Sequence, residues 1–90
     1  MHVVAINVTL NDPEAARDYL QSDIVPNVKQ APGFVAGYWY GDEAQRKGAA
    51  TIVFDSEDNA NALMNMIREQ EGPGHATIDS IDVHEVVANA

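Results

Sequence analysis

The chain has no cysteine, only five lysine and arginine residues, and no long apolar run. Without cysteine it has no disulfide, no thiolate nucleophile and no cysteine-ligated metal. Its fourteen acidic residues give a net charge of -9 at pH 7, which repels phosphate backbones, so we expect no nucleic-acid partner. No segment resembles a secretion signal or approaches the roughly 20 apolar residues of a membrane span. We therefore expect a cytoplasmic protein without a membrane partner.

Several catalytic and binding motifs are also missing. The sequence has no G-x-G-x-x-G, P-loop or G-x-S-x-G, which leaves nucleotide binding and serine hydrolysis without support. Its three histidines, His2, His75 and His84, do not have the spacing of a metal site. The sequence therefore predicts neither a metal nor a cofactor.

The length of the chain limits its core. Ninety residues make a single domain, 1–90, and a chain of this size buries only about 60–65% of its unfolded surface. Such small domains usually need additional stabilisation. Because no disulfide is available, association of two copies is the expected solution.

The first part of the chain predicts a strand followed by a helix. Residues 2–10 are rich in β-branched side chains, and their even positions form a wholly apolar face. Asp12-Pro13-Glu14 is a helix start, with Asp12 as the capping residue. Pro26 has no N–H to donate, which predicts a kink or a short second helix near it.

The remaining elements give the fold. We expect a strand at 34–41, a polar loop at 41–48, a strand at 49–55, a helix capped by Ser56 and ended by Gly72-Pro73-Gly74, and a strand at 76–88. The order is therefore βαββαβ. Right-handed crossovers turn it into a ferredoxin-like α+β fold, a four-stranded antiparallel sheet with both helices on one face.

The sheet is expected to be apolar on both faces. The residues that indicate this are Val3, Ala5, Val35, Trp39, Ile52 and Phe54. An exposed apolar face of that size aggregates or finds a partner. A second copy of the chain closing over it is the simplest solution.

Two segments resemble a known family. "PGF" after a proline-containing first helix, a hairpin, and then "FDSEDNANAL" resemble the dimeric α+β barrel proteins, in the branch that holds the antibiotic biosynthesis monooxygenases. The resemblance implies a homodimer whose two sheets meet as a barrel. It also implies a pocket, either within the barrel or between each sheet and its helices. The superfamily includes isomerases, haem-degrading enzymes and members with no assigned reaction.

The haem-degrading branch can be compared residue by residue. The resemblance assigns it an Asn on the first strand, a Trp just before the capping Ser, and a His about ten residues further on. Asn7 matches the first position, whereas Phe54 and Met64 stand at the other two. Without that imidazole the usual axial ligand is missing, so haem is not expected as a cofactor.

Alternation along the second strand defines a candidate substrate pocket. Because successive side chains of a strand point to opposite faces, four side chains of this strand are assigned to the helix side, namely Phe34, Ala36, Tyr38 and Tyr40. Trp39 then lies on the barrel side, where Gly37 leaves room for a planar ligand between Trp39 and Phe54. The other interpretation of Trp39 is packing in the core or the dimer interface.

Three polar residues are candidates for catalysis. Asn7 lies within the first strand and either binds a quinol or enolate oxygen or makes a cross-strand or dimer hydrogen bond. Asp82 and His84 are two apart on a strand, so they share a face. If Ile81 and Val83 face the helices, this face is that of Asn7, and Asp82 orients His84 as a proton acceptor. The alternative is a solvated polar edge.

These features leave three functions open. The first is a cofactor-independent, monooxygenase-like enzyme on a small aromatic, quinol or polyketide-like substrate, which the protein binds, deprotonates and shields from water. The second is a non-catalytic dimeric protein that binds an apolar ligand or serves a structural or stress-related role. The third, an isomerase, needs the same acid–base residues as the first.

Overall fold

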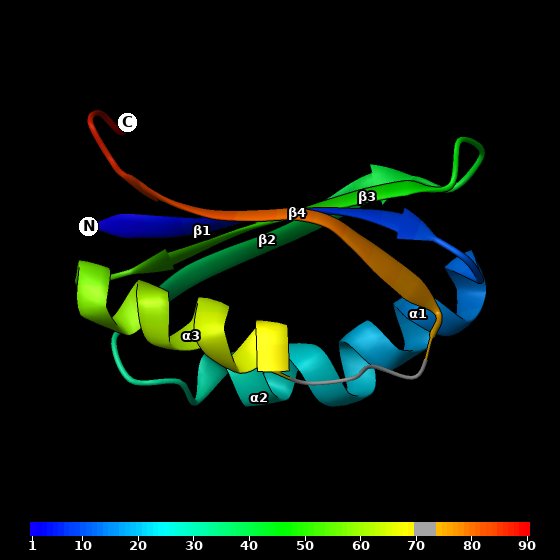
Figure 1. Ribbon diagram of the computed structural model, residues 1–90, viewed down its shortest axis with the longest axis horizontal. Coiled ribbons are helices and arrows are strands. Elements are labelled where there is room, and N and C mark those ends of the chain that lie inside the picture. Colours follow the sequence, from blue (N-terminus) through cyan, green and yellow to red (C-terminus); the bar gives the residue numbers. More distant parts are fainter. Residues whose placement is uncertain (70–73) are drawn as a thin grey trace.

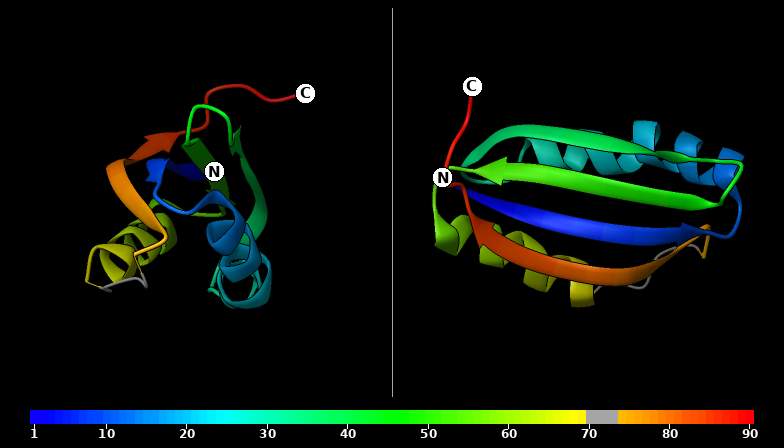
Figure 2. Two further views of the ribbon diagram at one scale, coloured as in Figure 1. Left: turned by 90° about the vertical axis from the view of Figure 1, so that its right-hand side faces the viewer. Right: turned by 90° about the horizontal axis from the view of Figure 1, so that it is seen from above.

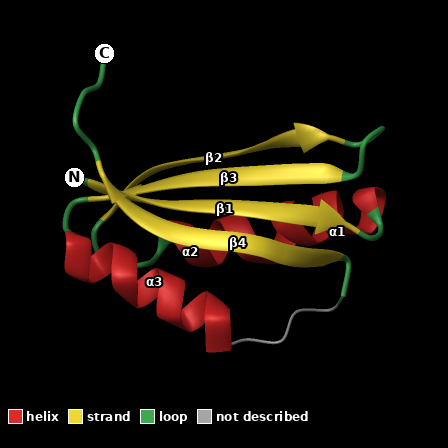
Figure 3. Cartoon of the chain, turned by 45° about the horizontal axis from the view of Figure 1, so that its top comes forward, coloured by secondary structure: helices red, strands yellow, loops and turns green. Residues whose placement is uncertain are grey.

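The structure is a computed structural model that describes residues 1–69 and 74–90. Its elements are β1 (His2–Leu10), α1 (Pro13–Tyr19), the π-helical turn η1 (Leu20–Ile24), α2 (Val25–Lys29), β2 (Phe34–Asp42), β3 (Lys47–Phe54), α3 (Glu57–Glu69) and β4 (Ala76–Glu85). The strands form one antiparallel sheet in the order β2-β3-β1-β4, and the helices cover one of its faces (Figure 1). The predicted ferredoxin-like α+β arrangement is confirmed. Figure 3 shows β2 and β4 at the two edges of the sheet.

A short second helix, α2, contains Pro26, which is one of the two alternatives predicted for this segment. The start of α1 is capped by Asp12, whose Oδ1 accepts a hydrogen bond of 3.1 Å from the N–H of Ala15. Just before Pro26 the helix widens into η1, where the N–H of Val25 donates to the carbonyl of Leu20, five residues back. A wider turn is one way to accommodate a residue that lacks the N–H for the usual pairing.

The second helix, α3, is amphipathic. The hydroxyl of Ser56 caps it by accepting from the N–H of Asn59 at 3.3 Å, as the sequence predicts. Ala60 and Leu63 are buried against the sheet. The predicted helix end at 72–73 lies outside the described residues. In residues 1–69 and 74–90, no helix has the length and apolar character needed to cross a membrane.

The core fills the space between the sheet and the helices, which lie on the same side of the sheet in both views of Figure 2. Along β1 the even positions point into it, so that Val4 and Ile6 are buried while Asn7 is exposed. From β3, Ile52 and Phe54 point the same way, with exposed fractions of 1% and 0%. The apolar face predicted for β1 is therefore the helix-facing one.

A β-bulge at the start of β2 reverses the predicted alternation. Phe34 pairs with Phe54 and Ala36 with Val53, so the intervening Val35 has no partner of its own on β3. A bulge adds one residue to a strand, and every later side chain then points to the opposite face.

The faces predicted for β2 are therefore wrong after Phe34. Trp39 pairs with the buried Ala50 and packs against the core on the helix side. The other three side chains assigned to that side, from Ala36, Tyr38 and Tyr40, lie on the opposite face. Only Phe34 lies where regular alternation placed it, with its ring edge-on to Phe54 at a centroid distance of 6.3 Å.

The last strand is shorter than predicted. β4 ends at Glu85 rather than at 88, and the N–H of Val86 donates to the carbonyl of Met1 at 2.9 Å. The final residues then leave the sheet on the side away from the helices (Figure 1), and Val87 is 91% exposed.

The assignment of faces can be tested by truncating one ring on each side of the sheet. We expect Phe54→Ala to lower the free energy of unfolding by about 3–5 kcal/mol, because it leaves a cavity in the core. Tyr38→Ala is the control from the opposite face, where the ring is 65% exposed, and at low protein concentration it should change this free energy by less than about 0.5 kcal/mol. The measurement is urea unfolding followed by circular dichroism. Should Phe54→Ala fail to fold, Phe54→Leu serves instead, and equal losses for the two rings would contradict the assignment.

Candidate functional site

We call the sheet surface turned away from the helices the open face. Residues paired across antiparallel strands share a face, so the strand registers define its members. They are Val3, Ala5, Asn7 and Thr9 of β1, Ala36, Tyr38, Tyr40 and Asp42 of β2, Lys47, Ala49, Thr51 and Val53 of β3, and Thr77, Ser80, Asp82 and His84 of β4.

The open face has small side chains in its middle and larger or polar ones at its edges. One row of paired residues runs Tyr38, Thr51, Ala5, Asp82 across the four strands. The next row runs Tyr40, Ala49, Asn7, Ser80. The two tyrosines on edge strand β2 are 65% and 62% exposed. A flat molecule lying on this face would therefore rest on small side chains, between aromatic rings and polar groups.

Asn7 makes a cross-strand hydrogen bond, one of the alternatives predicted for it. Its Nδ2 donates to the hydroxyl of Ser80 on β4 at 3.0 Å. An Asn amide has two donor hydrogens and an acceptor oxygen, and this bond uses one hydrogen. Within residues 1–69 and 74–90 the rest of the amide has no hydrogen-bond partner. Ser80 therefore orients the Asn7 amide and leaves part of it free to bind a ligand.

Asp82 and His84 lie on the same face as Asn7, as predicted from the alternation of β4. Ile81 is buried and Val83 packs against the core, so the two polar side chains point the other way and are exposed. In an extended strand residues two apart are separated by about 6.6 Å. The structure has no hydrogen bond between Asp82 and His84, so the carboxylate does not orient the imidazole as expected.

The predicted aromatic pocket of Trp39, Gly37 and Phe54 is not on this face. All three lie on the helix side of the sheet, and Phe54 is fully buried. Gly37 does provide room, but for the indole itself, because a Cβ there would lie 2.7 Å from a ring carbon of Trp39. The two rings therefore cannot sandwich a ligand beside Asn7, and packing in the core accounts for Trp39.

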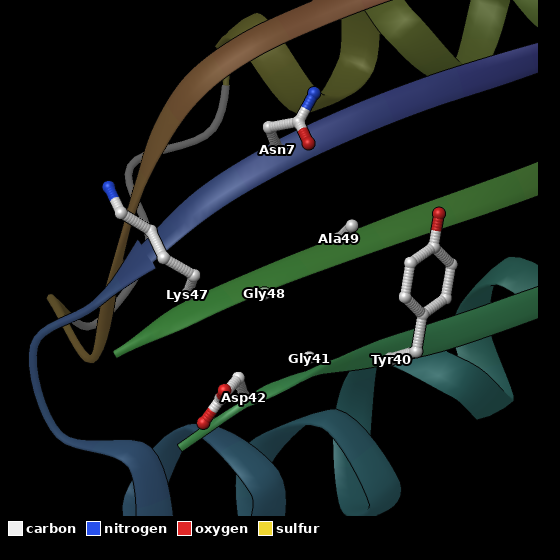
Figure 4. Close-up of a pocket in the computed structure, with 7 residues that line it drawn as sticks. All are labelled: Asn7, Tyr40, Gly41, Asp42, Lys47, Gly48 and Ala49. Atoms are coloured by element: carbon white, nitrogen blue, oxygen red, sulfur yellow. The ribbon is translucent and has the colours of Figure 1, made fainter. Parts of the chain in front are cut away.

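A shallow pocket of about 350 Å³ does open on the face, beside Asn7 (Figure 4). Its lining consists of Asn7, Tyr40, Gly41, Asp42, Lys47, Gly48 and Ala49. Figure 4 shows Tyr40 and Asn7 on either side of Ala49, with Lys47 and Asp42 toward the hairpin. Tyr40 was not predicted to line this site, because the bulge moves its side chain to this face. Lys47 was predicted to lie in the loop, whereas β3 begins with it.

Comparisons with known proteins give a match in structure but not in sequence. No protein-family model matches the chain, and no curated protein matches it. Among solved structures, HapK from Hahella chejuensis superposes with a TM-score of 0.69 at 12% identity, over 100% of this chain and 96% of that protein. MhuD from Mycobacterium tuberculosis, a heme-degrader whose structure has two hemes bound in its active site, superposes with a TM-score of 0.61 at 22% identity, over 98% of both chains.

The residues of this chain do not fit haem at the predicted positions. Phe54 is enclosed by the core and Met64 packs against that core from α3, so neither position presents an imidazole. What this chain shares with MhuD and HapK is its fold. The resemblance predicted from the sequence is confirmed at the level of the ferredoxin-like α+β fold, which this chain shares with both proteins over almost its whole length.

Proposed function

We propose that the protein is a homodimer whose two open faces meet as a barrel, and that it binds a small aromatic substrate between them. The observation that carries the proposal is the open face itself. It exposes two tyrosines, and the alanines and valines of its two central strands are interrupted by Asn7, Thr9 and Thr51 and by a charge only at Lys47, near the hairpin. The helices cover only the other side of the sheet. A solvated face would instead carry charged side chains in its middle. Closing a second copy over the face removes this surface from water.

The charges of the open face favour one arrangement of the two copies. Asp82 and His84 lie on β4 at one edge, and Tyr38 and Tyr40 lie on β2 at the other. If the two-fold axis of the dimer runs parallel to the strands, β4 of one copy lies over β2 of its partner. The tyrosines then meet polar side chains, and the Asp82 carboxylates of the two copies lie at opposite edges, which avoids repulsion between them.

The proposed interface can be tested with a charge introduced in its middle. We expect Ala5→Arg to convert the dimer to a monomer, because the new guanidinium lies at the centre of the open face. It should still fold, since its partner on β4 is Asp82. The control is Ala62→Arg on the exposed side of α3, which changes the net charge equally and should remain a dimer. Sedimentation velocity at micromolar concentration measures the outcome, and a wild-type monomer there would refute the proposed dimer.

Within this dimer we propose a cofactor-independent oxygenase reaction. The substrate ring lies across Ala5 of β1 and Ala49 of β3, the small side chains beside Asn7. The free part of the Asn7 amide hydrogen-bonds the substrate's oxygen, and His84, exposed on the same face, takes a proton from the substrate. Enclosure by the second copy excludes water from the reactive intermediate.

The chemistry requires only the substrate and dioxygen. For a substrate with an activated CH₂ group, as in an anthrone, His84 removes a proton and leaves a carbanion whose charge spreads to the ring oxygen. The carbanion gives one electron to O₂, and the two radicals form a C–O bond. Protonation gives a hydroperoxide, and loss of water breaks the O–O bond and leaves C=O. CH₂ and O₂ thus yield C=O and H₂O, with four electrons passing from carbon to oxygen.

The reaction can be tested by oxygen consumption with an anthrone such as dithranol. We expect His84→Ala to lower kcat by about 100-fold, as for loss of a general base. We expect Asn7→Ala to lower it by at least about tenfold, as for loss of a donor to a developing oxyanion. The controls are Glu85→Ala, the strand neighbour of His84, and Asn65→Ala on α3, which are exposed and should leave the rate unchanged. If His84→Ala and Asn7→Ala consume oxygen as fast as wild type, the assignment is wrong.

A non-catalytic dimeric ligand-binding protein is the second candidate. Two observations favour it, namely the missing hydrogen bond between Asp82 and His84 and the space between sheet and helices being filled by Trp39. It predicts that flat aromatics raise the thermal unfolding temperature while no oxygen is consumed. An isomerase would give a rearranged product without oxygen, which product analysis in the same assay detects.

A further inference from the structure

Lys47 is the one lysine or arginine of the open face among residues 1–69 and 74–90, in a chain with fourteen acidic and five basic residues. As the first residue of β3 it lines the shallow pocket at the end nearest the hairpin, diagonal to Asn7 (Figure 4). The pocket therefore combines a cation, an amide and the ring of Tyr40.

The contacts of Lys47 turn its ammonium toward Thr9 and Asp79, beside the pocket that its side chain lines (Figure 4), without using all its hydrogens. Nζ lies 3.0 Å from the hydroxyl of Thr9, to which it donates, and 3.7 Å from a carboxylate oxygen of Asp79. The Thr9 hydroxyl in turn donates to that same oxygen at 2.7 Å. An ammonium has three donor hydrogens, so at least one remains for a ligand.

The nearby carboxylate of Asp42 is engaged elsewhere. Its Oδ1 accepts hydrogen bonds from the N–H groups of Ala44 at 2.9 Å and Gln45 at 3.3 Å, which fixes it in the hairpin turn. The salt bridges of the described residues pair Lys47 with Asp79 and not with Asp42. Asp42 therefore closes the end of the pocket without neutralising Lys47 directly.

The rest of the pocket fits a planar group. Ala49 and the backbone of two glycines provide a low surface, and Gly41 admits no side chain, because a Cβ there would lie 2.4 Å from the carbonyl oxygen of Lys47. The Tyr40 ring stands at one side, where an aromatic ligand can stack on it. A volume of about 350 Å³ is at the small end of ligand pockets and suits one ring or two fused rings.

We propose that this pocket binds the deprotonated form of a planar phenol or enol, with its ring over Ala49 beside Tyr40 and its oxyanion held by Lys47 Nζ. The inference rests on the proposed function, whose substrate becomes such an anion, and it names Lys47 as the group that selects the ionised form. A neutral phenol also accepts the ammonium hydrogen, but without the attraction between opposite charges that strengthens the bond to a phenolate. A cationic ligand would be repelled by the ammonium.

The selection has a measurable consequence for the ligand's own ionisation. An exposed ion pair contributes up to about 1 kcal/mol, which corresponds to an affinity about fivefold higher for the phenolate than for the phenol. By linkage, the pKa of the bound phenol then falls by about 0.7 units. The effect belongs to the ligand, so it can be seen with a compound that does not react.

The test uses 4-nitrophenol, which titrates near neutral pH and whose ionised form is yellow. Its dissociation constant is measured by titration calorimetry below and above its pKa, and its bound pKa by absorbance. We expect wild type to bind the ionised form about fivefold more tightly. Lys47→Met should abolish the preference and Lys47→Arg should retain it. Lys29→Met, an exposed cation of α2 outside this pocket, removes the same charge and should behave as wild type.

Several outcomes would overturn the inference. They are equal binding of the two forms, no saturable binding at millimolar concentration, or equal loss of preference in Lys47→Met and Lys29→Met. The outcome is independent of the proposed oxygenase reaction. Oxygen consumption without phenolate preference rejects only the role of Lys47, whereas phenolate preference without oxygen consumption rejects only the reaction.

Discussion

One unpaired residue at the start of β2 decides which side chains each face of the sheet carries. Because Val35 has no partner on β3, Phe34 and Trp39 both point toward the helices although they are five residues apart. The indole then lies over Gly37 and completes the core together with Phe34 and Phe54. Regular pairing would have placed Trp39 on the open face and the two tyrosines in the core. The bulge therefore assigns the large apolar ring to the core and the amphipathic rings to the surface that remains exposed.

The filled core determines where a ligand can bind. With Phe54 fully buried and Trp39 packed against the core, a guest between the sheet and the helices would have to displace side chains. The open face has no such obstacle. Its polar groups, Asn7 and His84, are held by strands that pair along their length, so their positions are fixed by the sheet rather than by a loop. A site there is rigid but shallow until something closes over it.

The sequence predicted the fold well because its signals were local and mutually consistent. The cap at Asp12, the short second helix at Pro26 and the alternation of β1 each depend on near neighbours, and all three are confirmed. Asp82 and His84 were placed on the correct face because they alternate with the apolar residues Ile81 and Val83, which mark the helix-facing side of β4. The face of Trp39 was wrong because a bulge is a feature of pairing between strands, and Val35 looks no different from a regular strand residue. Lys47 was missed for the related reason that strand ends depend on the partner.

The proposed dimer and the proposed role of Lys47 are physically coupled. In a single chain the Lys47 side chain is 62% exposed, so water screens its attraction for an anion. A second copy closing over the open face removes part of that water and strengthens the interaction, because charge pairs attract more strongly where the effective dielectric constant is lower. Thermodynamic linkage then works in both directions, and a bound phenolate stabilises the dimer by as much as dimerisation tightens the binding of the phenolate.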